Sequence, residues 1–307
     1  MVKRHHALLK RLPDVHKDLH YLREEIRKME AGSRGENRIL KKLAEVRLPG
    51  QIKIFSDVRL ELGDWKVQID CLLVTDRCCI ILESKNFSDD LFIDTDSEEF
   101  YKIDKKGEEI SLPNPYFQLM KHIRFIKAYF QKELPNWNVI GAVIMTAKSC
   151  RIRKKPIHYP FYQLESMNEK VIQMYNQSNS PPLSSKQLQT IEQVILTEQF
   201  TFSYPPLCEF YRISPTELIA GVECPYCGVL GMKRNGKTWT CPSCKKNARD
   251  AHIQTVQEYF WLIKNEITNK EFRDFCKLDS IYSASRMLKN MNLHAHKGGA
   301  WRYYSPQ

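Results

Sequence analysis

The chain has 307 residues, 42% of them hydrophobic, which is enough for two or three domains with their own cores and excludes global disorder. It contains no run of 18 apolar residues, so we expect no transmembrane helix, and its basic N-terminal segment lacks the apolar stretch of a secretory signal. Ten cysteines without such a signal predict a reducing, cytoplasmic location in which thiols stay free or bind metal.

The net charge of +11 is concentrated near the C-terminus. Residues 233–307 hold 14 lysines and arginines against six acids, a net charge of +8, whereas residues 31–232 sum to zero. A basic terminal quarter beside a neutral body favours a surface that binds a polyanion. A solvated basic surface without a partner would give the same count.

The first predicted elements are helical. Apolar residues at spacings of three and four predict a helix over residues 14–30, which would serve as a packing helix or as the seam of a homodimer. Ser33 and Glu36 stand at capping-box spacing, so we expect the helix to break and restart there.

A mixed α/β order follows. Strands are expected at 52–60, 67–75, 78–86 and 91–95, a helix at 114–133 and a buried strand at 137–147. The acidic stretch 89–109 predicts a loop or hairpin, and a further helix is expected at 184–198. This order predicts an α/β domain with a mixed sheet.

The second and third strands contain charged residues in very apolar surroundings. If residues 76–77 form a two-residue turn, Asp70 lies opposite Glu83 and Gln68 opposite Lys85, with all four side chains on one face. Opposite Cβ atoms are about 4.5–5.5 Å apart, and two carboxylates at that distance repel unless a cation such as Mg²⁺ lies between them. The alternative is a solvent-facing polar stripe.

Four short motifs carry a family resemblance: GEN at 35–37, QID at 68–70, ESKN at 83–86 and NPYFQ at 114–118. In this order they resemble the successive blocks of the NERD (nuclease-related domain) family, over roughly residues 30–150. The resemblance implies a restriction-endonuclease-like fold, a mixed β-sheet flanked by helices, with a PD-(D/E)xK site.

The resemblance also assigns roles to residues. Asp70 and Glu83 match the acids that bind the catalytic Mg²⁺ or Mn²⁺, Lys85 matches the motif lysine, and Glu36 and Gln118 match further positions of the site. Glu36 has a simpler reading as the capping partner of Ser33, and Gln118 as a solvated helix residue. The family usually has a glycine soon after ESKN, where this chain has FSDDLF, so the loop beside the site is expected to differ.

The implied reaction is metal-dependent hydrolysis of DNA phosphodiester bonds. RNA is the other substrate that the same features allow. The alternative function is a non-catalytic DNA-binding or regulatory protein that uses the nuclease-like domain as an inactive scaffold.

The cysteines of residues 222–248 form two C-x₂-C pairs, Cys224 with Cys227 and Cys241 with Cys244. Four thiolates in two such pairs are typical of a closed, structural Zn²⁺ site in a zinc ribbon. The other six cysteines are expected to be small core residues.

The last segment predicts a DNA-binding module. Helices are expected at 251–266, 268–280 and 281–291, followed by a hairpin at 293–304, an order that resembles a winged helix-turn-helix. The candidate nucleic-acid contacts come from the third helix and the hairpin; they are Ser283, Ser285, Arg286, Lys289, Lys297 and Arg302. A small helical packing domain is the alternative.

These elements predict the following organisation: an N-terminal helix at 1–31, a nuclease-like domain at 32–205 with its core at 33–150, a linker at 206–221, a zinc ribbon at 222–248 and a winged-helix-like domain at 250–307.

Overall fold

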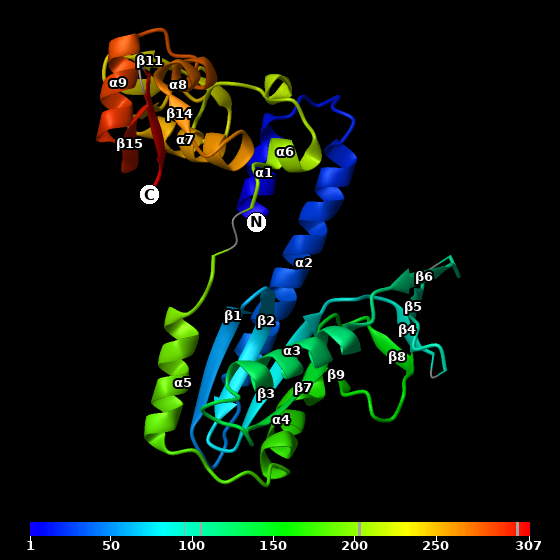
Figure 1. Ribbon diagram of the computed structural model, residues 1–307. Coiled ribbons are helices and arrows are strands. Elements are labelled where there is room, and N and C mark those ends of the chain that lie inside the picture. Colours follow the sequence, from blue (N-terminus) through cyan, green and yellow to red (C-terminus); the bar gives the residue numbers. More distant parts are fainter. Residues whose placement is uncertain (95, 105, 202–203, 299–300) are drawn as a thin grey trace. The chain divides into compact units, whose positions relative to one another are not determined.

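The computed structural model describes residues 1–94, 96–104, 106–201, 204–298 and 301–307 (Figure 1). The chain forms two compact units, Met1–Met29 together with Ser203–Gln307, and Glu30–Phe202. The first unit carries a net charge of +10 and the second a net charge of +1. None of the described helices is long and apolar enough to cross a membrane.

The unit Glu30–Phe202 is built on a five-stranded sheet in the order β1-β2-β3-β7-β9, antiparallel from β1 to β3 and parallel from β3 to β9. Its strands are β1 (Ile52–Leu62), β2 (Trp65–Thr75), β3 (Cys78–Lys85), β7 (Asn138–Met145) and β9 (Phe161–Gln163). Its helices are the C-terminal part of α2 (Leu19–Leu43), α3 (Pro115–Tyr129), η1 (Leu164–Ser166), α4 (Met167–Asn176) and α5 (Ser185–Thr197). The predicted strands, the helix at 114–133 and the helix at 184–198 are confirmed.

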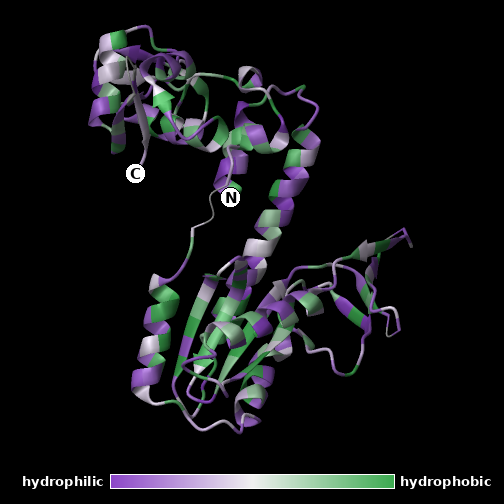
Figure 2. Cartoon of the chain, viewed as in Figure 1, coloured by the Kyte–Doolittle hydropathy of each residue, from purple (hydrophilic) through white to green (hydrophobic). Residues whose placement is uncertain are grey.

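The sheet is covered on both faces, so its central strands are nearly continuous apolar runs (Figure 2). Cys79 and Ile81 of β3 face the core formed with α3 and α5, and Ile80 and Leu82 face the core formed with α2 and α4. The side of β3 that carries Glu83 is therefore the side on which α3 packs.

The β2–β3 hairpin has the predicted register. Its pairs run from Val74↔Cys79 to Cys71↔Leu82, as a turn at residues 76–77 requires. The Thr75 hydroxyl accepts hydrogen bonds from the amides of Arg77 and Cys78, at 3.1 and 2.9 Å, which fixes the turn.

Of the two alternatives predicted for the acidic stretch, the hairpin is confirmed, because β4 pairs antiparallel with β5 and β5 with β6. Together with β8 from later in the chain, these strands form a small sheet in the order β6-β5-β4-β8. Its strands are β4 (Asp90–Ile93), β5 (Phe100–Ile103), β6 (Glu109–Leu112) and β8 (Arg151–Lys154). Residue 95, the end of the strand expected at 91–95, lies outside the described residues.

The prediction that a helix breaks and restarts at Ser33 is wrong. Residues 2–11 form helix α1, and α2 then runs without interruption through Ser33, which caps nothing. The helix is held close to the sheet at Gly35, where a Cβ atom would lie 2.6 Å from Thr146 Oγ1 and 2.9 Å from Ser84 Oγ. Tertiary packing thus overrides the capping pattern.

The apolar positions that suggested the seam of a homodimer differ in their exposure to solvent. Val15 lies before α2 and is 93% exposed, whereas Leu19, Leu22 and Ile26 are buried within the chain.

The other unit combines N-terminal and C-terminal residues around one core. It begins with α1 (Val2–Arg11), α6 (Leu207–Tyr211) and η2 (Pro215–Glu217), followed by a four-stranded sheet of β10 (Val222–Glu223), β11 (Leu230–Asn235), β12 (Thr238–Thr240) and β13 (Asn247–Ala248). It ends with α7 (Ala251–Leu262), β14 (Ile267–Thr268), α8 (Asn269–Cys276), α9 (Ile281–Asn290), β15 (Leu293–Gly298) and β16 (Trp301–Pro306). The last three strands form a sheet in the order β14-β16-β15, and residues 299–300, where the hairpin turns, lie outside the described residues.

A buried ion pair anchors α1 in this unit. Arg11 and Glu258 of α7 have side chains 0% and 1% exposed, and Arg11 Nη2 lies 2.7 Å from Glu258 Oε2. Arg11 Nη1 also donates to the carbonyl oxygens of Ile219 and Gly221, and the guanidinium lies over the Phe275 ring. Arg11 Nε donates a hydrogen bond of 2.8 Å to Glu258 Oε2, and these contacts together compensate much of the cost of burying the two charges.

Candidate functional sites

The predicted acidic residues lie where β3 leaves β2. The β2–β3 ladder stops at Cys71↔Leu82, while β3 continues beside β7 as far as Lys85↔Met145. Asp70 and Glu83 are therefore no ladder pair, and the Asp70 carboxylate instead accepts a hydrogen bond of 2.8 Å from the Ser84 amide. Asp70 remains beside the end of β3.

A hydrogen-bonded chain of side chains crosses from β3 to α3. Lys85 Nζ donates to Gln118 Oε1 at 2.8 Å, and Gln118 Nε2 donates to Glu83 Oε2 at 2.9 Å. Glu83 is 0% exposed, and its Oε1 accepts a hydrogen bond from His122 Nδ1. Gln118 and His122 are four residues apart on α3 and so share a face. The structure thus brings Lys85, Gln118 and Glu83 together.

The site has more negative charge than it compensates. The pKa of Asp70 is raised from 3.8 to about 7, first by burial and then by Glu83, with smaller opposing effects of the Ser84 amide and Lys85. The pKa of Glu36 is also raised, by burial and then by Asp57, although Lys85 lowers it. Glu36 therefore belongs to the same electrostatic cluster.

Two residues of the cluster were not among the predicted ones. Asp57 lies between the ladder pairs Ser56↔Cys71 and Val58↔Ile69 of β1 and β2. It has a left-handed φ of 54° and accepts a hydrogen bond of 2.6 Å from Gln68 Nε2. His122 could have been suspected from its position one helical turn after Gln118.

The carboxylates of Asp70 and Glu83 suit Mg²⁺ better than a metal ion whose ligands all come from the protein. Mg²⁺ is usually held by one or two carboxylates and keeps several waters. Among the described residues at this site, no three His, Cys, Asp or Glu side chains place their ligand atoms within 4.8 Å of one another. A cation bound by Asp70 and Glu83 would oppose the repulsion between the two carboxylates that contributes to the raised pKa of Asp70.

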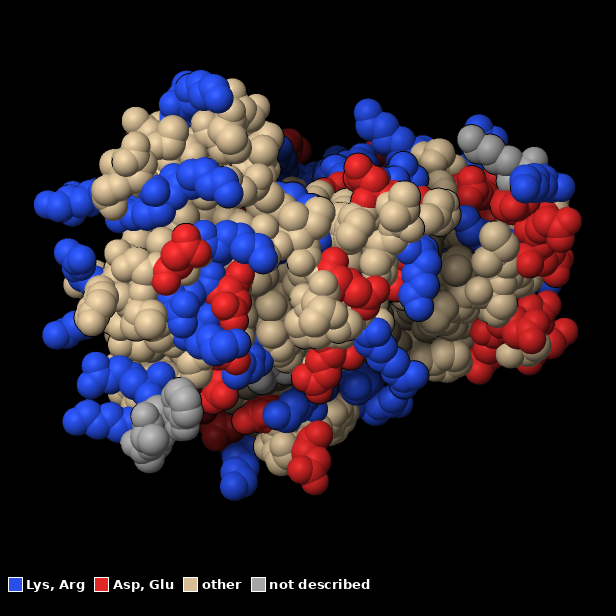
Figure 3. Space-filling model, turned by 90° about the horizontal axis from the view of Figure 1, so that it is seen from above, with Lys and Arg blue, Asp and Glu red and all other residues tan. Residues whose placement is uncertain are grey.

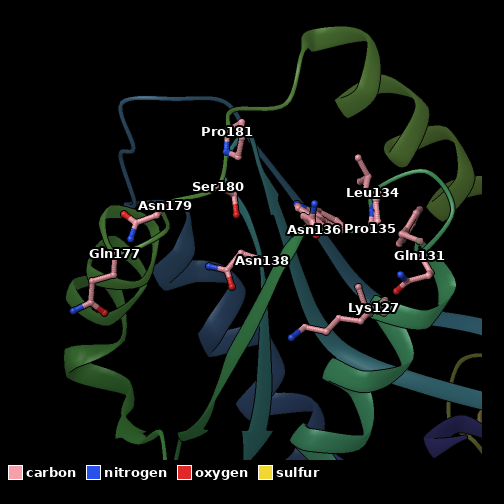
Figure 4. Close-up of a pocket in the computed structure, with 13 residues that line it drawn as sticks. Lys127, Gln131, Leu134, Pro135, Asn136, Asn138, Gln177, Asn179, Ser180 and Pro181 are labelled. Carbon is pink, nitrogen blue, oxygen red and sulfur yellow. The ribbon is translucent and has the colours of Figure 1, made fainter.

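A cavity of about 650 Å³ lies at the other end of the sheet, where β7 begins (Figure 4). Lys127, Asn138 and Ser180 line it, and none of the predicted catalytic residues does. The cavity is therefore separate from the acidic cluster.

The four predicted cysteines form a compact cluster. Their sulfur atoms lie within 4.8 Å of one another, with Cys224 to Cys244 and Cys227 to Cys241 each at 3.6 Å. A tetrahedral zinc with Zn–S bonds of about 2.3 Å implies S···S distances of about 3.8 Å, so the cluster can hold a zinc ion. The other six cysteines are free and buried, as expected.

Local backbone geometry forms this cluster. Each C-x₂-C pair is followed by a residue with positive φ, Gly228 at 73° and Lys245 at 61°. The Gly228 amide donates to the Cys224 carbonyl and the Lys245 amide to the Cys241 carbonyl, which closes two similar turns.

The predicted nucleic-acid contacts separate into two groups on α9 and the hairpin. Ser283 and Arg286 line one cavity, and Lys289, Lys297 and Arg302 line a second cavity of about 210 Å³. The sixth residue, Ser285, accepts a hydrogen bond from Asn269 Nδ2 at 2.8 Å and lines neither cavity.

The sequence and this geometry describe an α/β domain with an acidic cluster at the ends of its central strands. Residues 31–146 match the family model of the nuclease-related domain (NERD). That segment is therefore a nuclease-related domain. No curated protein and no solved structure matches the chain.

Proposed function

We propose that the unit Glu30–Phe202 is a Mg²⁺-dependent nuclease of the PD-(D/E)xK type that hydrolyses DNA. The observation that carries the proposal is the Lys85–Gln118–Glu83 hydrogen-bonded chain beside Asp70, in a segment that matches the nuclease-related domain. The order of α2, β1–β3, α3 and β7 also supports a restriction-endonuclease-like fold.

In this proposal each side chain has a separate task. Asp70 and Glu83 would hold Mg²⁺, which supplies Lewis acidity and lowers the pKa of a bound water. Lys85 would orient the attacking water or compensate charge on the phosphoryl oxygens. Gln118 holds Lys85 and Glu83 at a fixed spacing, because its amide oxygen and nitrogen are both engaged.

The other unit would bind the substrate. Its cysteine cluster would hold one structural Zn²⁺ in a zinc ribbon, and α7 to β16 have the helix and strand order of a winged helix-turn-helix. Its net charge of +10 supports contact with a polyanion, and Figure 3 shows lysine and arginine side chains gathered over its C-terminal elements. The ten free cysteines agree with a cytoplasmic location.

The experiment is cleavage of supercoiled plasmid by the full chain in Mg²⁺, Mn²⁺ or EDTA. Glu83→Gln and Lys85→Ala should each reduce nicking by about 100-fold or more without weakening DNA binding. Glu133→Gln and Lys132→Ala remove the same charges beyond the end of α3, and these controls should nick like the wild type.

The second candidate function is a non-catalytic DNA-binding protein. It would be favoured by tight, salt-sensitive binding of the wild type with no cleavage in any metal.

A further inference from the structure

A basic cavity lies between α9 and the four-stranded sheet of β10 to β13, which we call the cysteine-bearing sheet because its loops carry the four clustered cysteines. Its volume is about 510 Å³, in the range of about 300–1,000 Å³ typical of small-ligand sites. Its wall on α9 consists of positions 283, 286, 287 and 290, which form one face of the helix. The polar side chains that line it come from both elements and from the start of α7; they are Arg234, Lys237, Arg249, Asp250, His252, Ser283, Arg286 and Asn290.

Positive charge in this cavity is poorly compensated. Arg234, Lys237, Arg249 and Arg286 line it with one acid, Asp250. Within the described residues, none of the four cations lies within 4.0 Å of a carboxylate oxygen. Burial lowers the pKa of Arg234; Asp250 opposes this, whereas Arg249 and Arg286 lower the pKa further. Arg249 and Arg286 are thus each close enough to Arg234 to repel it.

Arg234 also has a donor without an acceptor. Its Nε is buried and makes no hydrogen bond within the described part of the chain. The guanidinium carbon lies 5.3 Å from the centroid of the Trp239 ring, which limits the orientation of the group. A buried donor that is left unpaired is destabilising, so an acceptor that entered the cavity would relieve this.

His252 adds a second donor. Its Nδ1 accepts a hydrogen bond of 3.2 Å from Trp239 Nε1, which can only donate, so the neutral ring carries its proton on Nε2. Burial lowers the pKa of His252 to about 4, and the ring is therefore neutral at physiological pH. No group in the described residues bonds to Nε2.

We propose that this cavity binds one phosphate group of a nucleic-acid backbone. Arg234 and Arg249 would donate hydrogen bonds to it from one side, and Arg286 from the other. Guanidinium groups match the geometry of phosphate oxygens, and three of them line the cavity, from β11, from the residues between β13 and α7, and from α9. One phosphate would thereby link the cysteine-bearing sheet to α9. The nucleic-acid part rests on the function proposed above, whereas the phosphate site itself does not.

The phosphate site is tested first, with inorganic phosphate added to the full chain at constant ionic strength. The Arg234 Nε–H signal, assigned by its loss in Arg234→Lys, should shift in heteronuclear NMR spectra as phosphate is added. The shift should disappear in the double variant Arg249→Gln/Arg286→Gln. A signal that does not respond to phosphate would overturn the proposal, whether or not the protein cleaves DNA.

The backbone ligand is tested by the affinity of the full chain for a short DNA duplex at several salt concentrations. Arg249→Gln/Arg286→Gln should bind about tenfold or more weakly, and its salt slope should fall by about one for each phosphate that the variant no longer neutralises. The control Lys233→Gln/Lys270→Gln removes the same charge from exposed residues of the same unit that do not line the cavity.

The two double variants distinguish the possible results. If Arg249→Gln/Arg286→Gln lowers the affinity for the duplex more than the control variant does, a backbone phosphate in the cavity is supported. Equal decreases for both doubles, with the phosphate response intact, would overturn the nucleic-acid ligand and leave an anion site. Duplex binding through the cavity without any cleavage would contradict the proposed nuclease activity and leave the phosphate proposal standing.

Discussion

Replacement of Asp70 by asparagine should stabilise the protein in the absence of divalent metal. The raised pKa means that the folded state retains a proton on Asp70 that the unfolded chain releases near pH 3.8. The stability that Asp70 contributes is therefore complete below pH 3.8 and is lost as the pH rises to about 7. Asparagine cannot ionise, so the variant escapes this loss.

The size of the effect follows from the pKa difference. At about 1.4 kcal/mol per pH unit, the difference between 3.8 and about 7 corresponds to about 4 kcal/mol above neutral pH. Asp70 is partly exposed and water screens some of this, so we expect Asp70→Asn to be more stable by about 2–4 kcal/mol near pH 8 and by much less near pH 5.

The assay is urea unfolding of the full chain in EDTA between about pH 5 and pH 8. Asp64→Asn, which replaces an exposed aspartate between β1 and β2, is the control and should change stability little at any pH. Mg²⁺ should then stabilise the wild type and not Asp70→Asn, because it binds only the folded, ionised site. A stability difference that does not change with pH would refute the reasoning.

Three further predictions concern packing, metal and the buried ion pair. Gly35→Ala should destabilise by about 1–3 kcal/mol in thermal unfolding because of the close contacts of its Cβ, whereas Gly32→Ala in the same helix, with no atom within 4 Å, should stabilise by up to about 1 kcal/mol. Elemental analysis should find one zinc per chain, and Cys241→Ser should lower both the zinc content and the melting temperature; a full zinc content in the variant would contradict the ligand assignment. Arg11→Met should destabilise by about 3–5 kcal/mol because it leaves Glu258 buried without its partner, and Arg11→Met/Glu258→Leu should regain much of that loss.

The sequence was most informative where short-range rules decide the structure. The two-residue turn at 76–77 determined the β2–β3 register, and with it the placement of Asp70 beside the end of β3. Thr268 and Glu271 have the spacing of a capping box in the sequence, and they form one at the start of α8, the helix expected at 268–280. Turn length and capping depend on neighbouring residues and so can be recognised from sequence.

The sequence predictions were wrong or incomplete where contacts between residues far apart in the chain determine the local structure. Ser33 and Glu36 have the same spacing as Thr268 and Glu271, yet α2 continues through them because Gly35 packs on Ser84 and Thr146. The N-terminal helix predicted at 1–31 is two helices, and α1 was not recognised as separate because its buried face includes His5 and Arg11, which interrupt the apolar pattern. The link from His122 to Glu83 and the grouping of arginines from the sheet and α9 depend on tertiary contacts that no local pattern records.

The discontinuous unit has a consequence for the order of folding. Residues from α1 to the start of α2, among them Leu8, Leu12 and Leu22, belong to a core whose other members come from beyond residue 203. During synthesis α1 therefore becomes buried only after the last third of the chain is made, whereas the unit Glu30–Phe202 is complete earlier and is able to fold first. Residues 1–29 are thus made before the unit Glu30–Phe202 but are buried after it. A fragment that begins at the nuclease-related domain would lack part of the core of the C-terminal unit.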